Sequence, residues 1–357
     1  MLKTAPAVFA VENEYQIMVN TTRPALFSVF VGDEEYFDES NGILRSISNL
    51  HRVRVPMKAL DKAKKYTVRV RPIIERKPYY TETEELLEFV FPFYPVPEKN
   101  VRAYHIADAH NRRTMPVNAA KAFGEIDFLI LNGDVIDHSG DPSKFDNVYD
   151  ICERLTHGSK PVVFSRGNHD MRGNYAECFA EYTPNANGNT YYTFRLGGLW
   201  GILLDCGEDK LDECDSYGHT ICCAQFRRRQ TAFLRRVIEN KEREYAAEGV
   251  THRLVISHVP FTTRFGEPFN IEEDTYTEWA RLLRENVKPN VMICGHVHQI
   301  GVWEKGGKKD SFGQPCDVVV ASRPEKESWI GGGFVFGEQI QVQFTDSNGE
   351  NLEEKTL

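Results

Sequence analysis

The chain of 357 residues lacks the features of several special protein classes. No apolar segment approaches the roughly 18 consecutive residues that a membrane-spanning helix needs, so we expect no transmembrane segment. The opening residues make a poor secretion signal, because the short apolar segment 5–11 contains Pro6 and is followed by Glu12. No internal repeat or low-complexity tract is evident. The length then fits one large globular domain and a smaller one.

Basic residues are not in excess. The 43 lysines and arginines are outnumbered by 52 aspartates and glutamates, which gives a formal net charge of -9. This charge repels polyanions at long range and argues against a surface that binds nucleic acid over much of its area. A small phosphate ester can still be attracted by a local cationic site. We therefore expect no nucleic-acid partner. The lack of a transmembrane segment predicts no membrane partner, and the oligomeric state stays open.

Metal-binding or disulfide-forming cysteine patterns are missing as well. The eight cysteines, at positions 152, 178, 206, 214, 222, 223, 294 and 316, show no Cys-x-x-Cys spacing. This favours reduced thiols and a cytoplasmic protein. A zinc or redox site made from Cys206, Cys214, Cys222 and Cys223 is the weaker hypothesis, because two adjacent cysteines chelate poorly and the tetrahedral spacing is absent.

The apolar pattern changes near residue 97. Before it, apolar and polar residues alternate with period two in short segments, which predicts an all-β domain over residues 1–97. Three prolines within residues 92–97 interrupt the chain. Strand-like and helix-like segments then alternate over residues 98–357, which predicts an α/β domain. Residues 60–70, with Tyr66, resemble the tyrosine corner of immunoglobulin-like and fibronectin type III sandwiches.

Helical patterns separate the strands of the second domain. The clearest covers residues 225–245, where apolar side chains recur on one face. Its basic run Arg227-Arg228-Arg229 is interpreted as a solvated helix face in preference to a binding patch. The predicted helices are 116–123, 143–155, 174–182, 225–245 and 274–286.

Five polar clusters each follow directly on an apolar run that is typical of a buried parallel strand. In an open α/β sheet, ligands bind outside the carboxyl ends of the strands, so the clusters should converge in one crevice. Asp108 and His110, two residues apart, can point the same way, and His296 and His298 repeat this spacing. Gly133, Gly167 and Gly295 each precede a proposed ligand and would let the backbone turn beside an ion. The clusters are Asp108-Ala109-His110, Gly133-Asp134-Val135-Ile136-Asp137, Gly167-Asn168-His169-Asp170, His258 and Gly295-His296-Val297-His298.

Carboxylate, imidazole and amide groups are ligands for hard to borderline divalent cations, and a carboxylate can bridge two of them. In order and type, the five clusters resemble the calcineurin-like metallophosphoesterase family over residues 100–345. The resemblance implies a four-layer α/β/β/α sandwich preceded by the immunoglobulin- or fibronectin III-like domain. It also implies two divalent ions and the following ligands: Asp108, His110 and His298 for one ion, Asn168, His258 and His296 for the other, and Asp134 bridging both.

Within the same resemblance, His169 is the general acid that protonates the leaving group. Asp137 would orient and charge His169, since a carboxylate beside an imidazole favours the protonated ring. Asp170 would hold the neighbouring ligands in orientation. Arg166, Arg172 and Arg112 are candidates for substrate binding, because a guanidinium fork matches phosphate oxygens. An equally good interpretation pairs each arginine with an acidic residue.

The layout resembles that of purple acid phosphatases, with one departure. The purple subgroup places a metal-binding tyrosine three residues after the bridging aspartate, where this chain has Asp137, and it lacks a histidine equivalent to His110. Without the phenolate, we expect Mn²⁺, Fe²⁺ or Zn²⁺ and no purple colour.

The sequence therefore predicts a metal-dependent phosphatase or phosphodiesterase that acts on a small or exposed phosphoester. Three alternatives are weaker. A protein-interaction scaffold on the same fold need not keep the ligands or His169. A carbohydrate-binding or adhesive protein would need a secretion signal, and a nuclease of this fold would need a basic surface.

Overall fold

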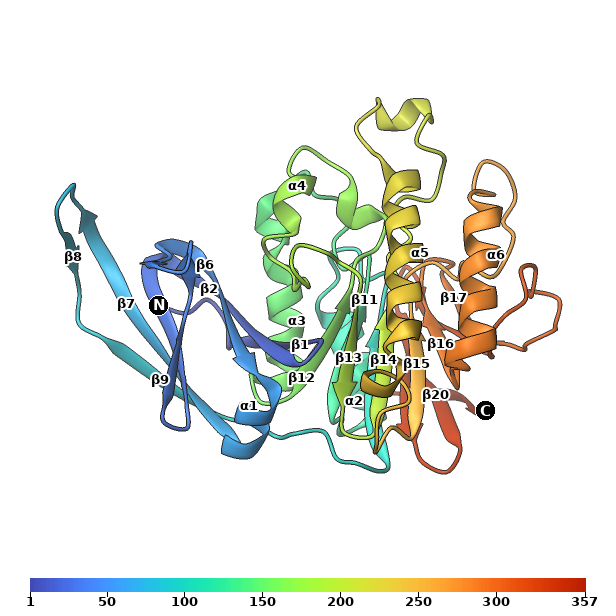
Figure 1. Ribbon diagram of the computed structural model, residues 1–357, viewed down its shortest axis with the longest axis horizontal. Helices are drawn as coiled ribbons and strands as arrows, with labels where there is room; N and C mark the ends of the chain where they lie inside the picture. The colour runs from blue at the N-terminus through green and yellow to red at the C-terminus, as the bar shows by residue number, and fades with distance from the viewer.

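The computed structural model describes residues 1–357. One extended sheet system carries both parts of the chain (Figure 1). Its first half is built on parallel strands, with antiparallel strands continuing it beyond β10. The strands of this half are β1 (Ala7–Val11), β12 (Pro161–Ser165), β11 (Phe128–Asn132), β10 (Val101–Ile106), β19 (Trp329–Phe336), β20 (Ile340–Asp346) and β21 (Asn351–Thr356).

The second half of the sheet system continues from β19 through β18. Strands β14, β15, β16 and β18 run parallel, and β13 and β17 lie antiparallel at the two ends. The bounds are β13 (Tyr192–Leu196), β14 (Leu199–Leu203), β15 (His252–Ile256), β16 (Val291–Cys294), β17 (Gln299–Trp303) and β18 (Val318–Pro324).

Helices cover the outer faces of both halves. One apolar cluster packs α2 (Thr114–Phe123) and α3 (Asp146–Thr156) on the first half. Another packs α5 (Cys223–Glu239) and α6 (Glu273–Leu282) on the second half. The inner faces share a third cluster of buried apolar side chains. The predicted mixed α/β fold is confirmed, and no helix is both long and apolar enough to cross a membrane.

Two helix predictions were too long. The segment predicted over 174–182 forms only the four residues of α4 (Ala176–Phe179). The helix predicted over 225–245 ends at Glu239 and is followed by a short 3₁₀ turn, Lys241–Arg243. The helix predicted over 274–286 agrees with α6, which continues as a π-helical turn at Leu283–Val287.

The N-terminal strands lie at one end of the molecule, drawn in blue and cyan in Figure 1. The 18-residue strand β2 pairs with β1 and β6 along its first part and with β3 and β7 along its second. A short helix, α1 (Met57–Ala63), connects β6 to β7. The remaining bounds are β2 (Glu14–Val31), β3 (Glu34–Phe37), β4 (Glu39–Ser40), β5 (Leu44–Arg45), β6 (Ser48–Pro56), β7 (Lys65–Arg76), β8 (Thr81–Thr83) and β9 (Leu87–Pro92).

Strand β1 ties the N-terminal strands to the second part of the chain. It pairs in parallel with β12, with Val8 opposite Pro161, and antiparallel with β2. The inner apolar cluster also contains residues from both sides of residue 97. The tyrosine-corner interpretation of Tyr66 is wrong in its bonding: the hydroxyl donates to the carbonyl of Gly158 at 2.6 Å, far along the chain, and not to a neighbouring residue.

Arg227 departs from the predicted solvated face of α5. Its side chain is fully buried, while Arg228 and Arg229 are exposed. The Arg227 guanidinium donates to the carbonyls of Cys206, at 2.7 Å, and Glu208, at 2.5 Å. A buried arginine is stable only where fixed acceptors meet its N–H donors. The helical pattern does not indicate such acceptors, so the prediction of an exposed Arg227 was wrong.

Replacing this arginine should destabilise the fold. We expect Arg227→Met to lower the free energy of unfolding by about 3 kcal/mol, because two buried carbonyls lose their donor. Arg228→Met on the exposed face is the matched control and should change stability by less than about 0.5 kcal/mol. Chemical denaturation measures both, and equal effects would show that the burial of Arg227 does not stabilise the loop that it holds.

Candidate metal centre

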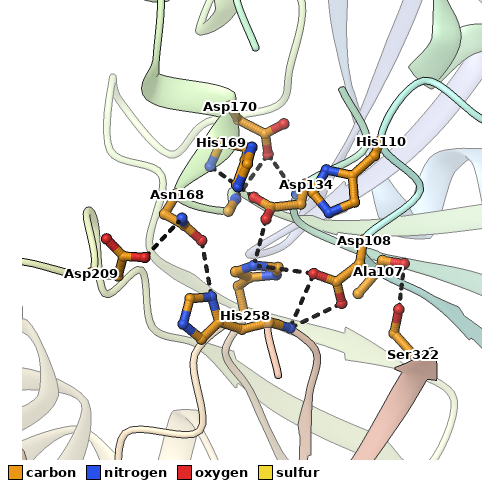
Figure 2. A network of polar contacts seen from close by, with 12 residues as sticks. Ala107, Asp108, His110, Asp134, Asn168, His169, Asp170, Asp209, His258 and Ser322 are labelled. Atoms are coloured by element: carbon orange, nitrogen blue, oxygen red, sulfur yellow. Dashed lines mark hydrogen bonds and ion pairs between the residues drawn. The ribbon is translucent and has the colours of Figure 1, made fainter. Parts of the chain in front are cut away.

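The five predicted clusters meet at one edge of the sheet system. The first proposed ligand of each cluster lies two or three residues beyond the end of a strand, after β10, β11, β12, β15 and β16. Figure 2 shows side chains of the first four clusters close together, among them Asp108, Asp134 and His258. The prediction of five strand ends in one place is confirmed by this geometry.

Two buried carboxylates and one buried imidazole form the centre of the site. Asp108, Asp134 and His258 are each at most 1% exposed. The Nε2 atom of His258 lies 3.2 Å from Oδ2 of Asp134 and 3.8 Å from Oδ1 of Asp108. Burial alone would lower the pKa of His258, but the two carboxylates raise it to about 10. Burial alone would raise the pKa of Asp134, but the surrounding imidazoles, His258 first among them, lower it.

His258 is oriented as a metal ligand would be. Its Nδ1 atom lies 2.7 Å from the carbonyl of Asn132, to which it donates a hydrogen bond. This bond leaves Nε2 facing the two carboxylates, as the nitrogen that a metal ion would take once its proton is lost. A histidine ligand usually donates its second N–H to a carbonyl in this way.

A second pair of imidazoles points at Asp108. Nε2 of His298 lies 3.4 Å from Oδ1 of Asp108. Nε2 of His110 lies 3.2 Å from Nε2 of His298. Two neutral imidazole lone pairs this close repel each other unless a proton or a cation lies between them.

The amide of Asn168 faces His296. Oδ1 of Asn168 lies 3.0 Å from Nδ1 of His296, and Nδ2 of Asn168 lies 3.4 Å from Oδ2 of Asp209. Burial and the neighbouring His258 lower the pKa of His296 to about 4, so its ring is neutral as a metal ligand must be. The donor set therefore fits divalent cations in both parts of the site.

The backbone is strained where the ligands lie. Five of the seven proposed ligands have a positive φ: 51° at Asp108, 45° at His110, 51° at Asp134, 68° at His296 and 51° at His298. Non-glycine residues rarely adopt this conformation, and it costs on the order of 1 kcal/mol or more each. Strain of this kind gathers at functional sites.

The three glycines serve close packing more than turning. Only Gly133 has a positive φ, of 82°. A Cβ on Gly167 would overlap the carboxylate of Asp134, and a Cβ on Gly295 would lie 2.8 Å from Oδ2 of Asp108. The sequence interpretation, a sharp turn at each glycine, therefore applies to Gly133 alone.

His169 lies beside the carboxylate of Asp134. Its backbone N–H donates to Oδ1 of Asp134 at 2.8 Å. Its Nδ1 lies 2.7 Å from the backbone carbonyl of Asp137, whereas the Asp137 carboxylate is 3.8 Å away and also 3.6 Å from Nδ1 of His110. The main-chain carbonyl of Asp137, more than its side chain, thus orients His169.

Asp170 is buried behind the ligands. Its Oδ2 accepts hydrogen bonds from the backbone N–H groups of Gly167, at 2.8 Å, and Asp134, at 3.1 Å. Burial and the nearby Asp134 raise the pKa of Asp170 to about 7. Asp170 therefore connects the loops after β11 and β12.

Two of the three candidate arginines are paired with buried acids. Arg166 lies 2.9 Å from Oδ2 of Asp205, and Arg172 donates to both oxygens of Glu208, at 2.9 and 2.8 Å. Nη1 of Arg112 is buried without a hydrogen-bond partner.

Sequence reasoning missed a second group of polar residues at the site. Glu208, Asp209 and Tyr217 come from the loop after β14. Both acids contact Arg172, Asp209 also contacts Asn168, and the hydroxyl of Tyr217 donates to the two acids. The signal was three acids within residues 205–209, but β14 was not predicted, so the loop was not recognised as a further strand end. The four cysteines of the zinc hypothesis are not among the groups of side chains placed to hold a metal.

Comparison with known proteins agrees with the site. Residues 101–300 match the family model of the calcineurin-like phosphoesterases. The chain belongs to this family. Its structure resembles a purple acid phosphatase from yellow lupin seeds, with a TM-score of 0.60 and 12% identity, covering 99% of this chain and 73% of that one. At that identity, the likeness concerns the fold alone.

Two curated relatives match about half of the chain. A zebrafish protein named serine/threonine-protein phosphatase CPPED1 is 26% identical over 206 residues, covering 55% of this chain and 59% of the relative. A Rhodopseudomonas palustris protein named probable cyclic nucleotide phosphodiesterase RPA0124 is 24% identical over 211 residues, covering 57% of this chain and 68% of the relative. The chain thus spans little more than half of the zebrafish protein.

The close approach at Gly167 gives a direct test of the site's packing. We expect Gly167→Ala to lower the free energy of unfolding by about 1–3 kcal/mol and to reduce metal binding, because the new methyl group displaces Asp134. Gly266→Ala, where a Cβ has nothing within 4 Å, is the control. Chemical denaturation and elemental analysis measure the two effects. Normal metal content in a folded Gly167→Ala variant would contradict the proposed position of Asp134.

Proposed function

We propose that this chain is a metal-dependent hydrolase of phosphoester bonds that acts on a small or exposed phosphoester. The observation that carries the proposal is the buried cluster of Asp108, Asp134 and His258. Its two carboxylates face Nε2 of one imidazole, at 3.2 Å from Asp134 and 3.8 Å from Asp108, so two acids share a single positive charge. Buried charges of this kind need a cation or an ion pair of good geometry.

The proposed cofactor is a pair of divalent ions, Mn²⁺, Fe²⁺ or Zn²⁺. Asp108, His110 and His298 would hold one ion, and Asn168, His258 and His296 the other, with Asp134 shared between them. When bound, two such ions activate a water molecule and neutralise charge on the phosphoryl oxygens. The absence of a tyrosine at Asp137 supports a centre without purple colour.

The chain's own contribution to the reaction is proton transfer to the leaving group. His169 is the proposed general acid. Its Nδ1–H donates a hydrogen bond to the carbonyl of Asp137, which leaves Nε2 as the atom that exchanges the proton. The hydrogen bond from the backbone N–H of His169 to Asp134 fixes the position of this ring relative to the proposed ligands. Arg112 is the proposed substrate-binding arginine, because its Nη1 is unpartnered.

Three finer features belong to the same proposal. Residues 1–97 would form a fibronectin III-like sandwich, residues 98–357 a four-layer phosphoesterase domain, and the protein would be cytoplasmic. The relatives are named a phosphatase and a phosphodiesterase, so monoesters and diesters are both candidate substrates. A screen of both ester classes with Mn²⁺, Fe²⁺ and Zn²⁺ in turn tests the activity.

Neutralising the carboxylate of Asp134 should reduce the number of metal ions bound. We expect the wild-type protein to bind two divalent ions per chain and Asp134→Asn to bind one or none, with most activity lost, since the amide carries no charge to share between two cations. Elemental analysis after loading measures the stoichiometry, and a thermal melt checks the fold. Two ions and near-normal turnover in the variant would overturn the bridging role.

Esters with poor and good leaving groups distinguish the role of His169 from that of the ions. We expect His169→Ala to slow hydrolysis of an alkyl ester by about 10² to 10⁴ and that of a p-nitrophenyl ester much less, because nitrophenolate leaves without a proton. Metal content should be unchanged. Equal losses on both esters would show that His169 stabilises charge or positions substrate and is not the acid.

A further inference from the structure

Arg172 is the most tightly held cation beside the site. Its Nε and Nη2 donate to the two oxygens of Glu208, and Nη2 also lies 3.1 Å from Oδ1 of Asp209. The hydroxyl of Tyr217 donates to the same carboxylates, at 3.0 and 3.1 Å. Glu208 is only 1% exposed, so its charge must be balanced here, and the guanidinium is fixed in orientation.

The fixed guanidinium turns its third nitrogen toward His169. Nη1 of Arg172 lies 3.2 Å from Nε2 of His169. Nε and Nη2 are occupied by carboxylates, and the contact of Nη1 is with Nε2 of His169, which accepts its hydrogen bond while the ring is neutral. Once His169 carries a proton on Nε2, Nη1 is the nitrogen of Arg172 that can donate to a substrate oxygen. Two donor nitrogens 3.2 Å apart can both reach one oxygen atom at about 2.8–3.0 Å from each.

We propose that Arg172 is a catalytic residue that donates a hydrogen bond from Nη1 to the leaving-group oxygen, beside His169. This inference rests on the proposed function. Glu208 is then a positioning residue, since it holds Arg172 through the two remaining sides of the guanidinium. Such a donor, fixed in advance, stabilises the negative charge that develops on the departing oxygen.

The bond between phosphorus and the leaving oxygen breaks, and its electron pair stays on that oxygen. The oxygen takes the proton of Nε2 of His169, while the oxygen of a water molecule forms the new bond to phosphorus and releases one proton to solvent. Arg172 keeps its protons throughout and contributes charge and a hydrogen bond. Solvent then returns a proton to His169.

Arg166 provides a matched comparison. It also follows β12, and its guanidinium is also paired with a buried carboxylate, that of Asp205. Its other contact is with the ring of Phe226, 5.5 Å away, and not with His169. Loss of Arg166 therefore reproduces the loss of a buried ion pair without the loss of a donor at the leaving group.

The test compares two leaving groups in the metal-loaded, full-length protein. The substrates are an alkyl ester and a p-nitrophenyl ester of whichever class, monoester or diester, the wild-type protein hydrolyses. We expect Arg172→Met to lower kcat by about 10²-fold on the alkyl ester and by less than about 10-fold on the p-nitrophenyl ester, with KM little changed. Arg166→Met should lower both by the same factor. In the double variant His169→Ala/Arg172→Met, the alkyl ester should react more slowly than in His169→Ala.

Each other outcome has a definite meaning. Equal losses on both esters with a raised KM would show that Arg172 binds the phosphoryl group, which overturns the inference. The inference is also overturned if the double variant hydrolyses the alkyl ester no more slowly than His169→Ala, since Arg172 would then act only through His169. If Arg172→Met does not fold, Glu208→Gln replaces it: a smaller loss with the same preference for the alkyl ester supports the inference, and equal losses overturn it. A wild-type protein inactive on every ester overturns the proposed function itself, and the inference with it.

Discussion

The burial of two carboxylates beside one imidazole is the constraint on which this site depends. Asp108 and Asp134 have almost no contact with solvent, and His258 is the only buried side chain between them that can carry positive charge. In a protein interior, uncompensated charge costs far more than any single hydrogen bond contributes. Loops that hold two acids this close together are stabilised when bound cations balance the negative charge. The positive φ angles of both aspartates add to the cost that metal binding would offset.

The part of the site that follows directly from strand ends could be predicted from the sequence. Each ligand cluster comes after an apolar run long enough to be recognised as a buried strand, and parallel strands deliver their carboxyl ends to one edge. The proposed ligands Asp108 and Asn168 could therefore be predicted from the sequence alone. The helices were predicted wherever an apolar face recurred, as in α5, but their ends were not, because α5 ends at Glu239 without a strong local stop signal.

Long-range pairings could not be predicted. Nothing in the local sequence indicates that Arg172 meets Glu208 across 36 residues, or that Arg227 is buried against the loop after β14. The same limit applies to β1, whose pairing with β12 is set by tertiary packing across the predicted domain boundary. The hydroxyl of Tyr66 likewise found a distant carbonyl in place of a local one. The spacing of apolar residues in the sequence predicts which face of a helix or strand a residue occupies, but not which residue it contacts there.

The central claim is that the carboxylates and imidazoles at these strand ends hold two ions with Asp134 between them. Crystals grown or soaked with Mn²⁺ and measured at a wavelength where manganese scatters anomalously would locate the ions directly. We expect two anomalous peaks about 3.5–4 Å apart, with an oxygen of Asp134 in contact with both. A single peak, or ions bound away from Asp108 and His258, would contradict the account.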